Sequence, residues 1–172
     1  MRSALTGHHF AGYSNRFWKL LYQSGLVPRA VTAGDDRRLP EWGFGVTNLV
    51  PRASPGIGAL KRAEYDAGRA RLVAKIRRWR PELVVLVGVT LYRALFAGRG
   101  LSHPVAMPNG GSTDHLPLPL GLRNETLGGV RVFVLPNPSG RNANYAHDEM
   151  LAAFRALKSY LDATGGRKAT PS

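Results

Sequence analysis

Residues Val130 to Tyr145, VRVFVLPNPSGRNANY, decide the fold. The opening run, VRVFVL, is rich in β-branched and apolar residues, which is typical of a buried strand. Two prolines and a glycine in PNPSG (136–140) then prevent a strand or a helix from continuing, and a helical pattern begins after Tyr145. A strand, a stiff loop and a helix in this order place the loop at the carboxyl edge of an α/β sheet, where ligands of open α/β sheets bind.

This loop carries small or hydrogen-bonding residues and no acid, namely Ser139, Gly140, Arg141 and Asn142. Such a surface suits the close approach of an anionic backbone. The alternative is an ordinary turn between a strand and a helix, with no ligand. These residues alone leave both interpretations open.

The composition indicates a basic, cysteine-free protein with one domain. Its 172 residues suffice for a single core, and 24 Lys and Arg against 11 Asp and Glu give a net charge of +13. Such an excess is common in proteins that bind nucleic acid, although a generally basic proteome would also produce it. The absence of cysteine excludes disulfides, thiolate zinc sites and cysteine-ligated clusters. With no membrane-length apolar run and no signal-peptide core, we expect a soluble, cytoplasmic protein without membrane partners.

Strands and helices are predicted to alternate. The run LVVLV (83–87) is apolar at every position, as in a parallel sheet covered on both faces. The other predicted strands are 43–50 and 130–135, and the predicted helices are 14–25 with Ser14 as N-cap, 60–79, 91–97 and 146–163. This order favours a doubly wound α/β domain, that is, a three-layer αβα sandwich around a short parallel central sheet.

We expect one domain over residues 1–164, followed by a disordered tail at 165–172. Residues 98–129 are rich in Gly, Pro and Asn and are expected to form a long loop. His103, Asp114 and His115 lie in that loop, but their spacing matches no metal-ligand pattern, so we predict no metal site.

The helix predicted over 60–79 carries a run of cations on the face opposite its apolar stripe. Charge runs of this kind are more often a solvated face than a DNA-reading one. The cations are Lys61, Arg62, Arg69, Arg71, Lys75, Arg77 and Arg78.

Four short stretches, in this order, resemble one known family: TGHHF (6–10), NRFWK (15–19), GVTNLV (45–50) and NPSG (137–140). They are similar to the pyrimidine-pocket loop, the helix behind it, the second strand and the minor-groove loop of the mismatch-specific uracil and thymine DNA glycosylases, within the uracil-DNA glycosylase superfamily. The resemblance runs from about Ser3 to Leu161, apart from 98–129.

The resemblance implies a DNA repair enzyme that removes uracil opposite guanine, with thymine and other damaged pyrimidines as further candidate substrates. The damaged nucleotide is rotated out of the duplex into a pocket, at a cost of about a few kcal/mol. Water then hydrolyses the N-glycosidic bond without metal or cofactor. The implied enzyme is a monofunctional monomer, and its partner is double-stranded DNA with G·U or G·T mismatches.

Three residues near the start of the chain are the implied pyrimidine-binding residues. Phe10 would stack on the extruded base, an interaction worth roughly 1–3 kcal/mol; the alternative is a core phenylalanine. Asn15 would hydrogen-bond the base edge or brace the loop. His9 is a candidate for orienting water, although it would also suit bonding to the loop backbone.

The implied DNA-binding residues follow the last strand. Arg141 would fill the gap left by the extruded base, with a plain phosphate contact as the alternative. Gly140 and Asn142 would meet the unpaired guanine, and Asn137 and Ser139 belong to the same loop.

One family motif is absent. Members begin with a strand ending in Gly-X-Asn-Pro-Gly, whose Asn positions the attacking water, and this sequence contains no such motif. We therefore expect either a longer functional protein, with this motif and first strand encoded ahead of Met1, or a truncated, catalytically inactive DNA-binding relative. A nucleotide-binding α/β protein is disfavoured because no strand is followed by a Gly-rich phosphate loop.

Overall fold

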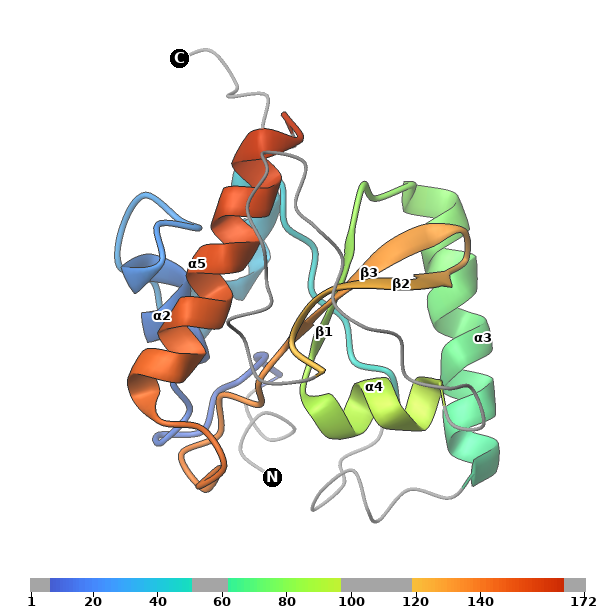
Figure 1. Cartoon of the computed structure of the whole chain (residues 1–172), viewed down its shortest axis with the longest axis horizontal. Helices are drawn as coiled ribbons and strands as arrows, with labels where there is room; N and C mark the ends of the chain where they lie inside the picture. Colours follow the sequence, from blue (N-terminus) through green and yellow to red (C-terminus); the bar gives the residue numbers. More distant parts are fainter. Residues whose placement is uncertain (1–6, 51–61, 97–118, 166–172) are drawn as a thin grey trace.

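A computed structural model describes residues 7–50, 62–96 and 119–165. Within these ranges the chain forms a three-stranded sheet flanked by helices (Figure 1). The elements in chain order are α2 Phe17–Gln23, the 3-10 helix η1 Ala33–Trp42, α3 Arg62–Trp79, β1 Val84–Val87, α4 Val89–Leu95, β2 Gly121–Leu127, β3 Val130–Leu135 and α5 His147–Ala163. The predicted mixed α/β class is confirmed.

Strand β3, the start of the fold-deciding stretch, is the centre of the sheet. The strand order is β1-β3-β2. β1 runs parallel to β3, with Val84 opposite Val132 and Val87 opposite Leu135, and β2 runs antiparallel to it. Residues 132–135 are all buried, as their continuous apolar pattern predicted.

The sheet is mixed rather than purely parallel, because β2 pairs antiparallel with β3. β2 lies in the stretch 98–129, which was expected to form a loop. Gly128 and Gly129 join β2 to β3 with φ angles of 61° and 85°. Two adjacent residues with positive φ form the tight hairpin turn whose twist suits antiparallel strands, and glycine adopts it without strain. The Gly-Gly pair between Leu127 and Val130 is therefore the sequence feature that marks this hairpin.

The strand predicted over 43–50 is wrong: this segment has no strand assignment and takes no part in the sheet. Its apolar pattern still works locally, because Phe44, Val46 and Leu49 pack against the core while Thr47 is exposed. The alternation of apolar and polar side chains determines which side of the segment packs against the core. A strand also needs a neighbouring backbone to bond, which a local pattern does not supply.

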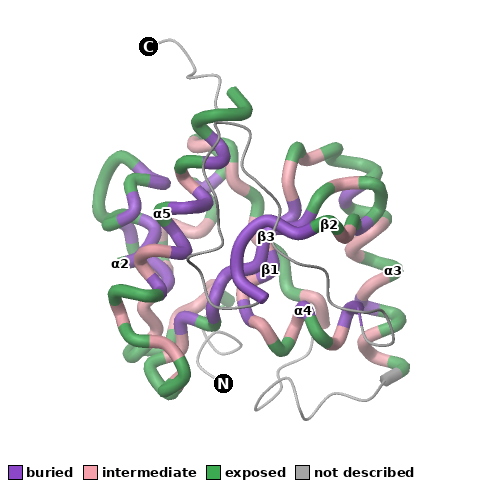
Figure 2. The backbone as a smooth tube through the Cα atoms, in the orientation of Figure 1, coloured by how far each residue is buried: buried purple, intermediate pink, exposed green. Residues whose placement is uncertain are grey.

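Helices cover the sheet from two sides. α5 contacts β2 and β3 and packs against α2, while α4 contacts β1 and β3 with α3 beside it. In Figure 1 the pair α2 and α5 lies to the left of the sheet, α3 lies to its right and α4 lies below it. The buried tube of β3 runs between them in Figure 2. Met150, Phe154 and Leu157 form a buried stripe along one face of α5.

The predicted helices are confirmed, with one change at the start of α2. Ser14 is not its cap; instead the Asn15 Oδ1 accepts the Phe17 N–H at 2.9 Å. Gly25, with a φ of 76°, follows the helix as predicted. In the first turn of α5, Glu149 accepts the N–H of Ala146 at 2.6 Å, which ties down the start of that helix.

A buried charged cluster holds α4 to β2. The side chain of Arg123 is fully buried, and its Nε lies 3.8 Å from the Glu125 Oε2. The Tyr92 hydroxyl donates to the other oxygen of Glu125 at 2.7 Å, and the Arg123 guanidinium lies 5.5 Å from the centre of the Tyr92 ring. Burial, and then the bond to Glu125, raise the pKa of Tyr92.

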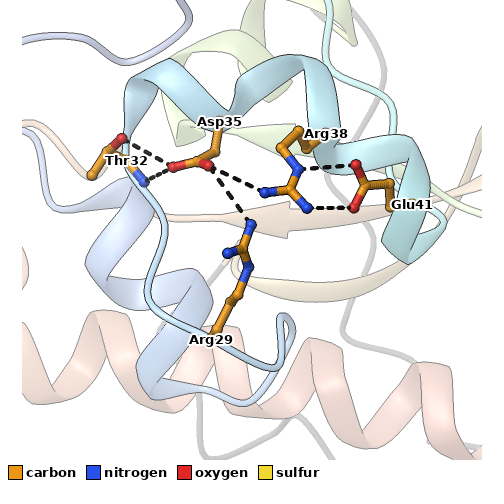
Figure 3. A network of polar contacts seen from close by, with 5 residues as sticks. All are labelled: Arg29, Thr32, Asp35, Arg38 and Glu41. Carbon is orange, nitrogen blue, oxygen red and sulfur yellow. Dashed lines mark hydrogen bonds and ion pairs between the residues drawn. The ribbon is translucent and has the colours of Figure 1, made fainter.

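A polar network fixes η1 (Figure 3). Thr32 donates to the Asp35 carboxylate from its N–H at 2.9 Å and from its hydroxyl at 3.0 Å, and these bonds lower the pKa of Asp35. Arg38 donates to both oxygens of Glu41 at 2.9 Å. Arg29 reaches Asp35 from the preceding loop. The next residue in the chain, Asp36, takes no part in this network. It binds the loop before α2 instead, and it therefore connects η1 to the site.

Candidate active site

The parallel strands β1 and β3 end side by side. Gly88, which follows β1, donates its N–H to the Leu135 carbonyl at 2.9 Å. Its φ of 122° is a conformation that glycine adopts without strain. A Cβ added at this position would lie 3.8 Å from the Asn137 Cβ. The carboxyl edge of the sheet therefore presents residues 136–142 directly, at the place where α/β proteins bind ligands.

Residues 136–142, here called the strand-end loop, are held by their own side chains. The Asn137 Oδ1 accepts the Ser139 N–H at 3.1 Å, and the Ser139 Oγ accepts the Arg141 N–H at 3.3 Å. The Asn142 Nδ2 donates to the Asn137 carbonyl at 2.8 Å. Asx and Ser turns of this kind fix a loop that has no regular secondary structure.

Residues 7–16, here called the pocket loop, meet the strand-end loop. The Arg16 N–H donates to the Pro138 carbonyl at 2.9 Å. The approach is closest at Gly140, where an added Cβ would lie 2.5 Å from the Ser14 Cβ and 2.6 Å from its carbonyl oxygen. Only glycine fits there. Two stretches singled out in the sequence, more than a hundred residues apart, thus form one surface.

Phe10 lies in the pocket loop with a strained backbone. Its φ is 51°, a region that side-chain-bearing residues occupy rarely and at a cost of about 1–3 kcal/mol. The ring is half-buried and stacks on Phe17 with centroids 4.0 Å apart and planes inclined by 22°. One ring face therefore rests on the core, as in the core interpretation, while the residue keeps partial exposure, as stacking on a base requires.

Asp36 anchors the pocket loop, although its surroundings in the sequence, DDRR (35–38), have the pattern of a solvated turn or short helix. Its side chain is only 6% exposed, and its Oδ1 lies 3.1 Å from the His8 Nδ1. Its Oδ2 accepts the His9 N–H at 3.1 Å. Partial burial alone raises the pKa of Asp36, but these hydrogen bonds and the nearby imidazoles outweigh it and hold the pKa below its usual value.

The other site residues have defined places. The His9 carbonyl accepts the Trp18 Nε1–H at 3.2 Å, so the His9 main chain is held from both sides. Asn15 braces the start of α2 through its Oδ1. Arg141 is exposed, and its side chain makes no bond within the described part of the chain. Asn142 is engaged inside the strand-end loop through both ends of its amide.

We expect Asp36→Asn to weaken folding by about 1–3 kcal/mol, because a nearly buried acceptor of two hydrogen bonds loses its charge. The folded pKa of Asp36 is depressed, so its contribution is present above the unfolded pKa and is lost as the pH falls through the folded pKa. Urea unfolding at pH 7 and below about pH 4 measures this. The difference in free energy of unfolding between the parent protein and Asp36→Asn should disappear at the lower pH. A difference that does not depend on pH would show that the substitution acts through packing alone.

In residues 7–50, 62–96 and 119–165, no three or more His, Asp or Glu side chains cluster so that they could hold a metal ion. No helix in these ranges is long and apolar enough to cross a bilayer. His103, Asp114 and His115 lie outside the described residues.

The structure has a mixed sheet covered by helices, and two of its loops meet at the carboxyl edge of the parallel strands. This arrangement is typical of α/β proteins with an open sheet, which bind ligands at that edge. The model of the uracil DNA glycosylase superfamily matches residues 1–161. The chain therefore belongs to this superfamily, whose members are DNA glycosylases of base excision repair that act on uracil.

Proposed function

We propose that this protein is a monofunctional DNA glycosylase that removes uracil from opposite guanine in duplex DNA, with thymine and other damaged pyrimidines as further candidate substrates. The junction of the pocket loop with the strand-end loop carries the proposal. It unites a half-buried aromatic ring, Phe10, with an exposed cation, Arg141, on a protein of net charge +13. Superfamily membership supplies the chemistry. In this proposal residues 1–164 act as one domain and as a monomer on DNA.

In the proposed reaction the target nucleotide leaves the stack and its base enters the pocket loop. Water attacks C1′ of the deoxyribose as the bond to the base nitrogen breaks, and the base departs as an anion with the bonding electrons. The proton that the water loses is released and is taken up by the departed base, which leaves a hydroxyl group on C1′. Phe10 holds the base by stacking, and Asn15 braces the loop or meets the base edge. His9 is the residue of this chain proposed to orient water, and its main chain is already fixed by Asp36 and Trp18.

The strand-end loop would fill the duplex behind the extruded nucleotide. Arg141 is the proposed wedge, because its side chain is exposed on a loop whose backbone is fixed. Gly140 and the backbone beside Asn142 would face the unpaired guanine. Asn137, Ser139 and the amide of Asn142 would support this contact by holding the loop.

Phe10→Ala should reduce single-turnover excision from a G·U duplex by about 10- to 100-fold, the equivalent of a base-stacking interaction. Binding to undamaged duplex should change little, because phosphate contacts are untouched. Phe10→Tyr, which keeps the ring, is the matched control. If the thermal midpoint collapses in Phe10→Ala and excision follows the folded fraction, Phe10 is a core residue and the pocket assignment is wrong.

Arg141→Ala should impair excision from G·U duplex far more than from single-stranded uracil DNA, since only a duplex leaves a gap to fill. The two substrates are compared in the same single-turnover assay. Arg155→Gln, an exposed arginine on α5, controls for the lost charge. Equal losses on both substrates would make Arg141 a phosphate contact.

A second candidate function, binding of mismatched DNA without cleavage, would use the same contact between the pocket loop and the strand-end loop. A relative that keeps the pocket and the wedge but cannot position water would bind mismatched DNA without cleaving it. Tight binding to a G·U duplex without release of uracil distinguishes this inactive relative from the proposed enzyme.

A further inference from the structure

The end of α3 leaves a tryptophan in water among arginines. Trp79 is 74% exposed, whereas Trp18 is only 6% exposed. Its neighbours Arg77, Arg78 and Arg80 are all exposed as well. A large ring kept out of the core is informative, because an isolated domain gains free energy by burying such a side chain.

These residues lie on the side of the sheet away from the strand-end loop. α3 ends at Trp79 and β1 starts at Val84, so the connecting residues lie at the amino edge of the parallel strands. Val84 is paired with Val132, which places the exposed Arg131 at the same edge. Arg77, Arg78, Trp79, Arg80 and Arg131 are here called the amino-edge patch.

The patch combines cationic charge with one exposed aromatic ring, that of Trp79. The guanidinium carbon of Arg78 lies 5.5 Å from the centre of the Trp79 ring, and that of Arg131 lies 5.5 Å from the centre of the ring of Tyr160, which is itself buried. Cation–π contacts of this length orient an arginine without neutralising it. Within the described ranges none of the four arginines forms an ion pair, and Glu82 is the only acid in the segment 77–83.

The backbone at Arg80 is strained. Its φ is 45°, and its N–H donates to the Ile76 carbonyl at 2.8 Å, which closes the helix. Glycine or asparagine normally takes this left-handed position after a helix, since other residues are strained there. Arg80 therefore occupies a position at which glycine would be more stable. Strain of this kind is found where a side chain has a binding role.

We propose that the amino-edge patch is a second DNA-binding surface that takes single-stranded DNA. The arginines contact successive phosphates, and an unpaired base stacks on Trp79, the combination by which sequence-tolerant single-strand binders work. A duplex offers phosphates but keeps its base faces covered, so it cannot use the tryptophan. The surface lies apart from the candidate active site and does not depend on the proposed glycosylase activity.

The test is the binding of a fluorescein-labelled deoxyadenosine oligonucleotide, followed by anisotropy over a range of salt concentrations. This strand has no pyrimidine for the candidate pocket. Trp79→Ala should weaken binding by about 5- to 100-fold, as expected for one lost base stack, while Trp79→Phe should retain most of it. Arg77→Gln with Arg78→Gln should reduce the slope of log K against log salt by about 1.4, since each phosphate contact on a single strand contributes about 0.7.

Arg155→Gln on α5, which removes one positive charge away from the patch, serves as the charge control and should lower the slope by no more than about 0.7. Thermal melting verifies that each variant folds. The proposal is overturned if Trp79→Ala binds as tightly as the parent protein. It is also overturned if the arginine variant loses as much affinity for a matched duplex as for the single strand and Trp79→Ala changes neither affinity. The patch would then be a contact for duplex phosphates. Uracil release from a short G·U duplex should be unchanged by Trp79→Ala, so this inference and the proposed activity fail separately.

Discussion

Gly140→Ala should lower single-turnover excision of uracil from a G·U duplex by at least about 100-fold, the effect of a misplacement near 1 Å in a catalytic arrangement. The new Cβ would lie 2.5 Å from the Ser14 Cβ and 2.6 Å from the Ser14 carbonyl oxygen. A backbone oxygen cannot rotate away as a side chain can, so the strand-end loop must retreat from the pocket loop. The bond from Arg16 to Pro138 would stretch with it.

Gly12→Ala is the matched control. It makes the same chemical change in the pocket loop, where the added Cβ would meet only the Asn15 Cβ at 3.9 Å, an ordinary contact. Excision by Gly12→Ala should stay within about threefold of the parent protein, a change below 1 kcal/mol in activation free energy. Equal activity of the two variants would show that the contact between the loops does not shape the site.

Arg123→Ala should lower the free energy of unfolding by about 3–5 kcal/mol, because it leaves Glu125, whose side chain is only 11% exposed, without its counter-charge. Arg123 is fully buried and joins β2 to α4 through Glu125 and Tyr92. Urea unfolding at pH 7 measures the loss. A domain is typically stable by about 5–15 kcal/mol, so this one change would remove a large part of the margin.

The double variant Arg123→Met/Glu125→Leu provides the contrast. It removes both charges and keeps comparable volume, and apolar replacement of a buried ion pair is often neutral or stabilising. It should therefore unfold at a higher urea concentration than Arg123→Ala. If Arg123→Ala costs less than about 1 kcal/mol, the range of an exposed ion pair, the cluster does not hold α4 to the sheet.

The sequence was sufficient to predict β3, the loop after it, and α5, because local patterns determine each of them: a β-branched run, two prolines with a glycine, and an apolar stripe at helical spacing. The strand at 43–50 was wrong. The strands β1 and β3 are parallel as predicted, but β2 adds an antiparallel strand that makes the sheet mixed. Both differences depend on which strands are neighbours, which a local pattern does not determine. The hairpin of β2 was predictable in principle, since Gly128 and Gly129 provide the two positive φ angles that it requires.

The candidate site was predictable in its loops but not in its supports. Phe10, Asn15 and the strand-end loop were recognised by resemblance, and the structure places the two loops in contact. Asp36 was missed because its burial depends on His8 and His9, which lie 28 and 27 residues away in the chain. A pair of aspartates beside two arginines has the local pattern of a solvated turn, and only tertiary contact changes that.

The most direct test of the central claim is single-turnover release of uracil from a G·U duplex, with Phe10→Ala and an undamaged G·C duplex as references. The proposed glycosylase predicts free uracil and an abasic site from the G·U duplex, a strong reduction in Phe10→Ala, and no product from the G·C duplex. Tight binding of the G·U duplex with no uracil released would contradict the proposed activity and identify a DNA-binding relative without catalysis.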